Sequence, residues 1–514
     1  MDGAALLAPL RMKAIGESPT IRRSAWLLGI ILFFGSAYFY QDPEWNGNSR
    51  LDLTRAIVEQ GRLEIDAYHD APGWATGDKA YYDGHYYSDK AIGASLMGVP
   101  IYFVLFHVTN ALGVAVSGAA VKHVLTTGVM GVMFTLSGLS MYLVALCIVS
   151  RPWKAALPTL AVAFGTMLWP YSAVFYGHLP AAAFLILAFA LLFGAKYAEA
   201  RGSRKVWFWV GISVSMAFVS DFTSAVVIVG LAVYALHVLS ALGTPAKVRA
   251  AWPAVVGLII PLIVLASYNT AVYGRPLAFG YAYEVEERFQ EIMGLGIMGI
   301  RLPAVGASYH ISFDPKFGLV WLSPVLLLAP VGYVIALWAR RWRAESLLSM
   351  YAIGVVFAMN AASYLWHGGS TFGPRLLIPA LPFFVVPLAM LPGALLWPQA
   401  TLGLVSAANM LIPLLGQIQY TRLEFKPDRG GFFVAGAPFR GFSLLYDYGL
   451  PQVWQLAKSG RSPWTLGTGL GFPLWLSVTV LLAVVFGLLV ALRRLDGQKG
   501  ATEPGHAAAR RIRP

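Results

Sequence analysis

Residues 24–62 read S-A-W-L-L-G-I-I-L-F-F-G-S-A-Y-F-Y-Q-D-P-E-W-N-G-N-S-R-L-D-L-T-R-A-I-V-E-Q-G-R, a long apolar run that passes directly into polar sequence. An apolar run like residues 24–40 is typical of a helix that crosses a bilayer. Because lipid offers the backbone no hydrogen-bond partners, we expect the run to be helical throughout. No cleavage pattern of small residues follows it, which indicates a retained first span and not a removable signal.

The rest of the chain repeats this apolar pattern. Only 12% of the 514 residues are charged, and the mean hydropathy is +0.63. A water-soluble protein carries about 25% charged residues, and the strands of a membrane barrel would alternate polar and apolar residues. We therefore expect an all-α polytopic membrane protein with about twelve spans, at residues 24–40, 123–149, 155–173, 179–197, 206–220, 222–242, 253–273, 317–339, 346–366, 376–397, 399–419 and 469–492.

Lysine and arginine are distributed unevenly among the predicted loops. With both termini in the cytoplasm, the cytoplasmic segments hold 21 basic and 6 acidic residues, and the remainder of the chain holds 17 basic and 19 acidic residues. Every loop then follows the positive-inside rule. The net charge of +13 is explained by this topology, so we expect no nucleic-acid partner.

Residues 91–109 are also apolar enough to span. A span here would reverse every later loop and place outside the eleven basic residues of the short loops between Arg151 and Arg343, against the positive-inside rule. We therefore expect the segment to lie in the interface or to re-enter on the outer side. Residues 1–495 then form one transmembrane domain, residues 496–514 form a disordered basic cytoplasmic tail, and the large extracytoplasmic loops are residues 41–122, 274–316 and 420–468.

The first extracytoplasmic loop is dense in polar side chains, since residues 41–90 hold ten acidic residues, five basic residues and five tyrosines. Within it, residues 49–62 have helical spacing, with Ser49 as a cap and Gly61 as a stop, and predict an amphipathic helix on the membrane surface. Farther on, T-G-D-K-A-Y-Y-D-G-H-Y-Y-S-D-K at residues 76–90 places tyrosine pairs around an Asp-Gly turn, which predicts a small β-hairpin. This polar patch favours chemistry at the membrane surface.

Carboxylates of the first loop are candidates for acid–base chemistry. Asp42 and Glu44 follow the first span, and Asp52 lies on the predicted surface helix. A carboxylate at the boundary of water and lipid can take a proton from a hydroxyl, because partial burial raises its pKa. Solvated loop charges are the alternative for each of them. A divalent-cation site formed by Asp42, Glu44 and Asp221 is a further option.

Two basic residues lie where an anion would be bound. Lys90 immediately precedes residues 91–109, where an ammonium would meet a lipid phosphate. In W-H-G-G-S-T-F-G-P-R, residues 366–375, glycines and a proline break the chain at the outer end of one span, and Arg375 opens the next. An arginine beside free backbone N–H groups suits a phosphate, and His367 could assist. The alternatives are a tyrosine-rich turn without a ligand, and an arginine that snorkels or pairs with a carboxylate.

Isolated polar residues also interrupt the apolar spans. Asp221 is expected near the outer end of two spans, where a charged residue usually faces a cavity, although a plain turn is the alternative. His178, in F-Y-G-H-L-P, begins an outer-facing span, and such a histidine is more often a satisfied residue of a core or interface. Asn269 is more typical of a hydrogen bond between helices than of a ligand contact.

Several kinds of chemistry lack their sequence signature. The one cysteine, Cys147, lies in an apolar run and predicts a small buried side chain, so neither a disulfide nor a cysteine-based metal site is expected. The sequence contains no H-x-x-x-H, no H-E-x-x-H and no G-x-x-x-x-G-K-[ST] pattern. The missing phosphate-binding loop argues against an ATP-driven pump and against a cytosolic nucleotide-sugar donor.

Five motifs together resemble the GT-C glycosyltransferases, multi-span enzymes that take a sugar from a polyprenyl-phosphate carrier on the outer membrane face. They are N-G-N-S-R-L-D-L-T-R, T-G-D-K-A-Y-Y-D-G-H-Y-Y-S-D-K-A-I-G, F-Y-G-H-L-P, Y-N-T-A-V-Y-G-R-P-L-A-F-G-Y and W-H-G-G-S-T-F-G-P-R-L-L-I-P-A-L-P. The second and fifth are the more specific, and they are similar to bacterial members related to the aminoarabinose and protein O-mannosyl transferases. The resemblance covers most of the chain and implies a bacterial cytoplasmic (inner) membrane location.

The resemblance implies an inverting transfer of a sugar from a polyprenyl-phosphate donor to a hydroxyl on a glycan, lipid or protein acceptor, in contact with membrane lipid. In the family a lysine after an aromatic-rich turn contacts the carrier phosphate, and Lys90 matches it, although relatives commonly read K-A-P-G where this chain has K-A-I-G. The expected phosphate-binding residues are Lys90, Arg375, Arg55 and His367. The expected sugar- or acceptor-binding residues are Asp78, His85, Tyr86, Tyr87, Asp89, His178 and Asp221.

The catalytic base departs from the family pattern. In the family it is an aspartate of the first loop, and the corresponding D-E pair falls here on Gly47 and Asn48, neither of which ionises as an acid. Asp42, or failing that Asp52, is expected to deprotonate the acceptor. No cofactor is required by the sequence, and a divalent cation remains an option.

Two other functions are compatible with parts of the sequence. A transporter or flippase for a lipid-linked or anionic solute would also use a helix broken by glycine and proline, as at residues 366–374. No inverted repeat is evident, and the polar residues are concentrated on one face, which argues against it. A non-catalytic scaffold would leave the charged and aromatic residues 76–90 unexplained. The enzyme hypothesis predicts that the side chains of four residues, Asp42, Lys90, Asp221 and Arg375, meet in one outer cleft. A transporter instead needs a path through the bilayer.

Overall fold

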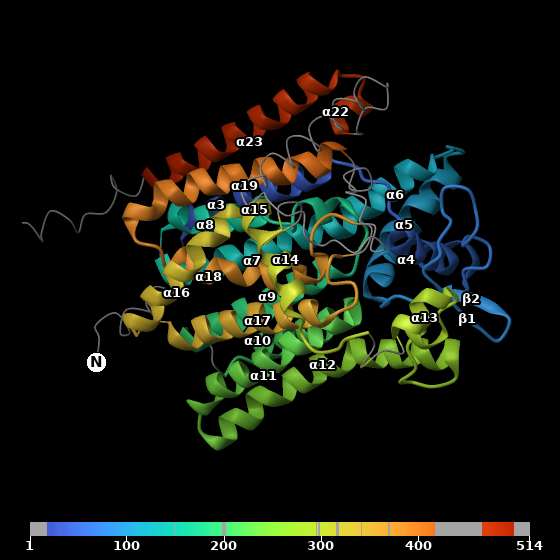
Figure 1. The fold of residues 1–514 in the computed structure, drawn as a ribbon, viewed down its shortest axis with the longest axis horizontal. Helices are drawn as coiled ribbons and strands as arrows, with labels where there is room; N and C mark the ends of the chain where they lie inside the picture. The colour runs from blue at the N-terminus through green and yellow to red at the C-terminus, as the bar shows by residue number, and fades with distance from the viewer. Residues whose placement is uncertain are drawn as a thin grey trace, which may run out of the picture.

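The computed structural model describes residues 18–149, 151–197, 202–293, 296, 299–314, 318–340, 342–368, 371–416 and 465–497. The predicted outer loop 420–468 and the predicted tail 496–514 therefore lie almost entirely outside the described residues. Within the described part the chain is mostly helical, and most of the long helices run along the long axis of the molecule (Figure 1). Their length and composition are those of a multi-pass integral membrane protein.

Eight helices in the described residues are long and apolar enough to cross a membrane. Five are simple helices: α5 (Gly93–Ala111), α9 (His178–Tyr197), α12 (Thr244–Tyr273), α17 (Arg343–Ala362) and the segment Leu474–Leu495 of α23 (Leu474–Gly497). Three are composite. Gly118–Val149 consists of α6 (Gly118–Thr126), the π-helical turn η2 (Thr127–Gly131) and α7 (Val132–Val149); Phe222–Ser240 consists of η4 (Phe222–Ser224) and α11 (Ala225–Ser240); and Gly393–Leu415 consists of η8 (Gly393–Leu395) and most of α19 (Leu396–Gly416). Seven of them coincide with predicted spans. The eighth, α5, is the segment that the charge pattern places in the interface, and that position stays a prediction.

The other five predicted spans are shorter, broken or more charged. Two form single helices, α3 (Pro19–Ala37) and α10 (Arg204–Ser220). A third, α8 (Pro152–Phe164), ends before its predicted end and is followed by the 3-10 helix η3 (Pro170–Ala173). The last two are each divided into short pieces: α15 (Leu319–Leu322), η6 (Pro324–Leu328) and α16 (Ala329–Trp338), and η7 (Arg375–Phe384), α18 (Val385–Ala389) and η8.

Proline explains why these two predicted spans are broken. Proline has no backbone N–H and its ring collides with the preceding helical turn. Pro379 and Pro382 lie inside η7, which is a 3-10 helix, and Pro324 opens η6. The segment after Arg375 is therefore not the continuous α-helix that its apolar composition predicts.

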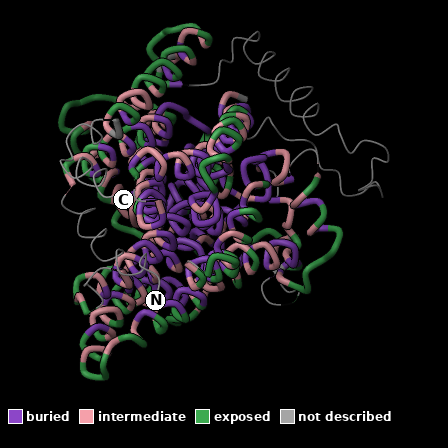
Figure 2. Tube along the Cα trace, turned by 90° about the vertical axis from the view of Figure 1, so that its left-hand side faces the viewer, coloured by how far each residue is buried: buried purple, intermediate pink, exposed green. Residues whose placement is uncertain are grey.

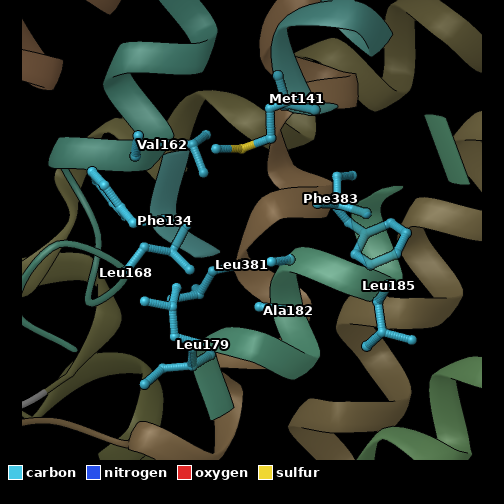
Figure 3. Close-up of a cluster of buried hydrophobic side chains, with 14 of the residues drawn as sticks. Phe134, Met141, Val162, Leu168, Leu179, Ala182, Leu185, Leu381 and Phe383 are labelled. Carbon is cyan, nitrogen blue, oxygen red and sulfur yellow. The ribbon is translucent and has the colours of Figure 1, made fainter. Parts of the chain in front are cut away.

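The core lies where α7, α8, α9 and η7 meet. Figure 3 shows Phe134 of α7, Leu185 of α9 and Phe383 of η7 pointing into one apolar cluster, and all three are fully buried. Figure 2 shows the same pattern for the whole molecule, with buried chain at the centre and exposed chain at the periphery. The seventeen residues of α9 between His178 and Lys196 are all apolar, so this central helix separates two polar ends.

One end of the molecule, here called the hairpin end, gathers α4 (Trp45–Arg55), α5, α6, α13 (Glu287–Met293) and the β-hairpin at the right of Figure 1. Segment 274–316 also contributes η5 (Gly280–Tyr283) and α14 (Val305–Phe313), and α22 (Leu466–Gly469) precedes α23. The turn between α11 and α12 and the end of α16 lie at the opposite end.

The β-hairpin predicted from the tyrosine pairs is confirmed. Strand β1 (Lys79–Tyr82) pairs antiparallel with β2 (His85–Ser88), with Lys79 opposite Ser88. Both turn residues are left-handed, Asp83 at φ 50° and Gly84 at φ 87°. An Asp-Gly pair favours this turn because it matches the twist of the two strands.

The predicted surface helix is displaced and enclosed. Helix α4 begins at Trp45, and Ser49 is therefore an interior residue bonded to Ser88 and Asp89, so its prediction as the cap is wrong. The stop is confirmed, because the π-helical turn η1 (Ala56–Gln60) ends at Gly61, which has a left-handed φ of 66°. Residues 47–54 are all buried, so α4 packs inside the hairpin end instead of resting with one polar face in water.

Candidate functional site

Lys90 lies in a buried ionic group at the hairpin end. Its Nζ is 3.0 Å from Oδ2 of Asp78 and also contacts the carboxylate of Asp89. The ammonium lies over the ring of Tyr281, 5.4 Å from its centroid. Although burial alone would lower it, Asp78 and Asp89 hold the pKa of Lys90 above its usual value. The ammonium therefore remains charged in a nearly closed environment.

Local folding explains this arrangement. Asp78 and Asp89 directly flank the paired strands of the hairpin, so the antiparallel register brings them together. Gly280 at the start of η5 lies against Asp89, and a Cβ added there would be 2.6 Å from the Cα of Asp89. Only glycine allows this approach, which places the next residue, Tyr281, over Lys90. Burial and the neighbouring Asp89 raise the pKa of Glu284, three residues after Tyr281.

Arg375 reaches the same region from the glycine-rich segment. Left-handed Gly368 and Gly373, at φ 85° and φ 66°, turn the chain back before the arginine. The guanidinium carbon of Arg375 lies 5.3 Å from the ring centroid of Tyr176. Its Nε is buried and has no hydrogen-bond partner among the described residues. Arg375 also interacts electrostatically with Asp78, the carboxylate that pairs with Lys90.

Arg50 is a third buried cation at this place, and the sequence reasoning missed it. Its Nη1 donates to Oδ1 of Asn46 at 2.9 Å, and its buried Nε has no partner in the part of the chain that the structure describes. Arg50 and Arg375 both interact with Tyr176, and Arg50 and Lys90 both interact with Tyr281. The helical spacing predicts that Arg50 lies on a polar face. Asn46, one turn earlier on the same face, could have indicated a buried arginine, because its side chain can accept a hydrogen bond from the guanidinium.

Arg50, Lys90 and Arg375 are here called the cation cluster. They come from α4, the end of the hairpin and η7, which are far apart in the chain. A buried charged donor without a partner costs roughly 1–3 kcal/mol or more. A bound anion could accept from the free Nε groups of Arg50 and Arg375 at once, and phosphate suits arginine donors especially well.

His178 and Asp221 form a pair beside the cation cluster. Nδ1 of His178 is 2.5 Å from Oδ2 of Asp221, and Oδ1 of Asp221 accepts from Thr223 N at 3.0 Å and Thr223 Oγ1 at 2.7 Å. Although burial opposes it, His178 and Thr223 hold the pKa of Asp221 below its usual range. Gly177 makes the pair possible, because a Cβ there would be 2.1 Å from the carbonyl oxygen of Ser220.

The two predicted bases lie elsewhere on the hairpin end. Asp42 is about half exposed and pairs with Lys122 at 3.0 Å. Asp52 is fully buried, and within the described ranges neither of its carboxyl oxygens has a hydrogen-bond partner. Burial raises the pKa of Asp52 to about 8 against the opposing influence of Arg55 and Lys122.

Arg55 is predicted to bind phosphate, but the structure surrounds it with other partners. Its Nε is 2.8 Å from Oε1 of Glu59, and its guanidinium carbon lies 4.2 Å from the ring centroid of Tyr68 and 4.1 Å from that of Trp74. Tyr68 and Tyr102 both donate to Glu59. Arg55, the last residue of α4, is therefore held by Glu59 and by a separate group of aromatic side chains.

Four other predicted binding residues, His85, Tyr86, Tyr87 and His367, have contacts outside the cation cluster. His85 is about half exposed at the hairpin turn, and its Nδ1 is 2.6 Å from Asp66. Tyr86 packs on His69, and Tyr87 packs against Tyr273. His367 contacts Trp366 edge to face. Of the predicted binding residues, the structure thus gathers Asp78, Asp89, Lys90, His178, Asp221 and Arg375.

The predicted divalent-cation site is not assembled in the part of the chain that the structure describes. No group of three or more His, Cys, Asp or Glu side chains there could hold a metal ion. Asp42 pairs with Lys122 and Asp221 with His178, so two of the three predicted ligands have separate partners.

Comparisons with known proteins give low-identity structural similarity. No family profile and no curated protein matches the sequence. ArnT from Cupriavidus metallidurans bound to undecaprenyl phosphate is similar with a TM-score of 0.49 and 13% identity, over 94% of this chain and 77% of ArnT. Its apo state gives a TM-score of 0.48 and 14% identity, over 92% and 76%. Archaeal oligosaccharyltransferase AglB from Archaeoglobus fulgidus, in complex with an inhibitory peptide and a dolichol-phosphate, gives 0.41 and 12%, over 76% of this chain and 56% of AglB.

Proposed function

We propose that this protein is a GT-C-type membrane glycosyltransferase that moves a sugar from a polyprenyl-phosphate carrier to a hydroxyl acceptor. In this proposal the chain crosses a bacterial inner membrane about twelve times. The hairpin end faces the extracytoplasmic side and both termini face the cytoplasm, as the distribution of lysine and arginine favours. The donor enters sideways from the lipid, and the acceptor is a glycan, lipid or protein.

The observation that carries the proposal is the pair of buried Nε groups of Arg50 and Arg375, which have no hydrogen-bond partner among the residues that the structure describes, beside the charged Lys90. Arg50 shares Tyr176 with Arg375 and Tyr281 with Lys90, and three cations linked in this way suit an anion with several oxygens. A phosphate bound there would leave its lipid tail free to extend into the membrane, since the site lies at one end of a bundle of apolar helices.

The chemistry follows from the charges. As the acceptor oxygen attacks the anomeric carbon of the sugar, the bond to the carrier phosphate breaks and negative charge grows on the leaving oxygen. Fixed cations in a poorly hydrated site stabilise that charge, which lowers the barrier. A single displacement of this kind inverts the anomeric centre, and Asp78 and Asp89 hold Lys90 in place during the reaction.

A transporter or flippase is less well supported. The helical segment after Arg375 is broken, and transporters use such discontinuous helices to bind their substrates. However, α9 starts at His178 beside the cation cluster and ends near Lys196, which pairs with the buried Glu345 at 2.7 Å. The two ionic groups are separated by about 27 Å of helix, and every residue of α9 between them is apolar.

The test is turnover with a panel of polyprenyl-phosphate sugars, measured as release of free carrier phosphate by purified protein. Lys90→Ala and Arg375→Ala should each lower turnover by roughly 10–1000-fold, the scale of losing one charge-stabilising donor. Arg62→Ala, at an exposed arginine of the same loop, should retain wild-type turnover. Movement of solute or lipid across liposomes without release of carrier phosphate would favour the transporter instead.

Folding must be checked because Lys90→Ala leaves Asp78 and Asp89 without their counter-charge. Arg375→Lys keeps the positive charge and removes only the guanidinium, and its thermal unfolding should match the wild type while its turnover falls. Wild-type turnover in both Arg375→Lys and Arg375→Ala would refute the phosphate role of this residue.

A further inference from the structure

The proposed reaction needs a group that takes the proton of the acceptor hydroxyl, and the two predicted bases of the first loop are engaged or enclosed elsewhere. Asp52 is closed to solvent, and Asp42 pairs with Lys122. Gly47 and Asn48 cannot ionise as acids. The pair formed by His178 and Asp221 is a built acid–base arrangement that packs on Tyr176 of the same region.

The geometry of the pair fixes which ring nitrogen is reactive. A carboxylate only accepts hydrogen bonds, so Nδ1 of His178 donates to Asp221. Asp221 cannot turn away, because the backbone N–H and the hydroxyl of Thr223 both bind its other oxygen. Nε2 then carries the lone pair. In the described part of the chain it has no hydrogen-bond partner, and the side chain is 14% exposed.

Several contacts join this pair to the cation cluster. The ring of His178 packs edge to face on Tyr176, with centroids 6.3 Å apart, and Tyr176 carries Arg375 over its ring. A Cβ added to Gly177 would be 3.1 Å from Nη2 of Arg50, so the arginine lies against the residue before His178. On the other side, Tyr281 interacts with both Lys90 and Asp221.

We propose that His178 is the catalytic base and that Asp221 is its positioning residue, an inference that rests on the proposed glycosyl transfer. Nε2 takes the proton of the acceptor hydroxyl while the acceptor oxygen bonds to the anomeric carbon of the donor sugar. The bond from that carbon to the phosphate oxygen breaks, and its electron pair leaves with the phosphate at the cation cluster. The imidazolium that forms is stabilised by Asp221 and later releases its proton to water.

His178→Asn separates this role from a merely structural one. The asparagine amide can occupy the position of Nδ1 and keep the hydrogen bond to Asp221, but it has nothing in the position of Nε2. If the pair only ties two helices together, the variant behaves as the wild type. If His178 is the base, the variant should lower the transfer rate roughly 100–10,000-fold, the usual contribution of general-base catalysis. Binding of polyprenyl phosphate alone should be unchanged.

Chemical rescue gives a second measurement. His178→Ala opens a space at a partly exposed side chain, and added imidazole should restore part of the lost transfer. Asp221→Asn should lower kcat with little change in KM for the donor, because it misorients the base without touching the phosphate site. His237→Asn, an exposed histidine of α11 at the opposite end, is the matched substitution and should retain full activity.

The competing base is Glu44, which interacts electrostatically with Arg375 and Tyr176. A large loss of transfer in Glu44→Gln combined with wild-type transfer in His178→Asn would overturn the inference and assign the base to Glu44. Failure of imidazole to restore any activity in a folded His178→Ala would also overturn it. If wild-type protein neither binds polyprenyl phosphate nor releases it from any donor, the proposed function itself fails, which is a distinguishable result.

Discussion

Asp52 carries a fully buried carboxyl group, and its two oxygens have no hydrogen-bond partner among the residues described by the structure. Its pKa is raised to about 8 from an ordinary value of 3.8, because burial disfavours the charged form more than Arg55 and Lys122 favour it. Between these two values the folded protein holds a proton that the unfolded chain has released. Stability therefore falls as pH rises through this window, by at most about 1.4 kcal/mol per pH unit.

Asp52→Asn should remove this dependence, because the amide is neutral at every pH. Between pH 5 and pH 8 the thermal unfolding temperature of the wild type should fall by more than that of the variant, and the variant should be the more stable protein at pH 8. Glu287→Gln, at an exposed carboxylate of α13, should keep the wild-type slope. Parallel curves for the wild type and Asp52→Asn would contradict the assignment.

Individual site residues differ in how far the sequence could reveal them. Lys90 was found because charge and aromatic residues are concentrated around it, and Arg375 because glycine and proline precede it. Arg50 was missed because helical spacing alone cannot tell which face of α4 the rest of the protein will cover. The burial of Asp52 was unforeseen for the same reason.

Gly177 is the element-scale feature on which the His178 site depends. It lets the start of α9 touch the end of α10, where a Cβ would lie 2.1 Å from the carbonyl oxygen of Ser220. Backbone cannot move aside as a flexible side chain can, so the two helix ends would have to separate. The bond between His178 and Asp221 spans this junction and would lengthen with it.

Gly177→Ala should therefore lower both stability and transfer. We expect a loss of about 1–3 kcal/mol from overpacking and at least a tenfold fall in turnover. Gly354→Ala on α17 is the matched control, since nothing lies within 4 Å of its Cβ position and helical alanine is favoured over glycine by roughly 0.5–1 kcal/mol. Thermal unfolding and turnover measured side by side decide the question, and wild-type values for Gly177→Ala in both would contradict it.

Elements defined by local chemistry were predicted better than elements defined by context. The hairpin follows from two tyrosine pairs and an Asp-Gly turn, all within a few residues. The start of α4 was misplaced because Ser49 resembles a cap in sequence, whereas in the structure it bonds to Ser88 across the hairpin. The apolar run after Arg375 looked like a span, but Pro379 and Pro382 make it a 3-10 helix.

At the scale of the whole molecule the open question is whether α5 crosses the bilayer. It is one of the eight helices with sufficient length and apolarity. Yet Tyr102 in its middle donates to Glu59 of η1 at 2.5 Å, and Thr54 of α4 donates to the carbonyl of Ser95 at 3.0 Å. The first half of α5 thus lies alongside polar elements of the hairpin end, which favours an interfacial position.

Cysteine accessibility tests this topology. In a Cys147→Ala background, Ala115→Cys should react with a membrane-impermeant maleimide from the same side as Asp83→Cys at the hairpin turn. Gly243→Cys, between α11 and α12, should react only after the membrane is permeabilised. Labelling of Ala115→Cys only after permeabilisation, combined with labelling of Gly243→Cys from outside, would show that α5 spans and that every later loop is reversed.

The sequence by itself determined that this is a multi-pass helical membrane protein with its polar residues concentrated in the first loop, because span length, loop charge and turn chemistry are written in neighbouring residues. Only the tertiary structure decided that Arg50, Lys90, Arg375 and the His178–Asp221 pair share one place. These groups lie far apart in the chain and meet through helix packing, glycine contacts and burial, none of which a local pattern specifies.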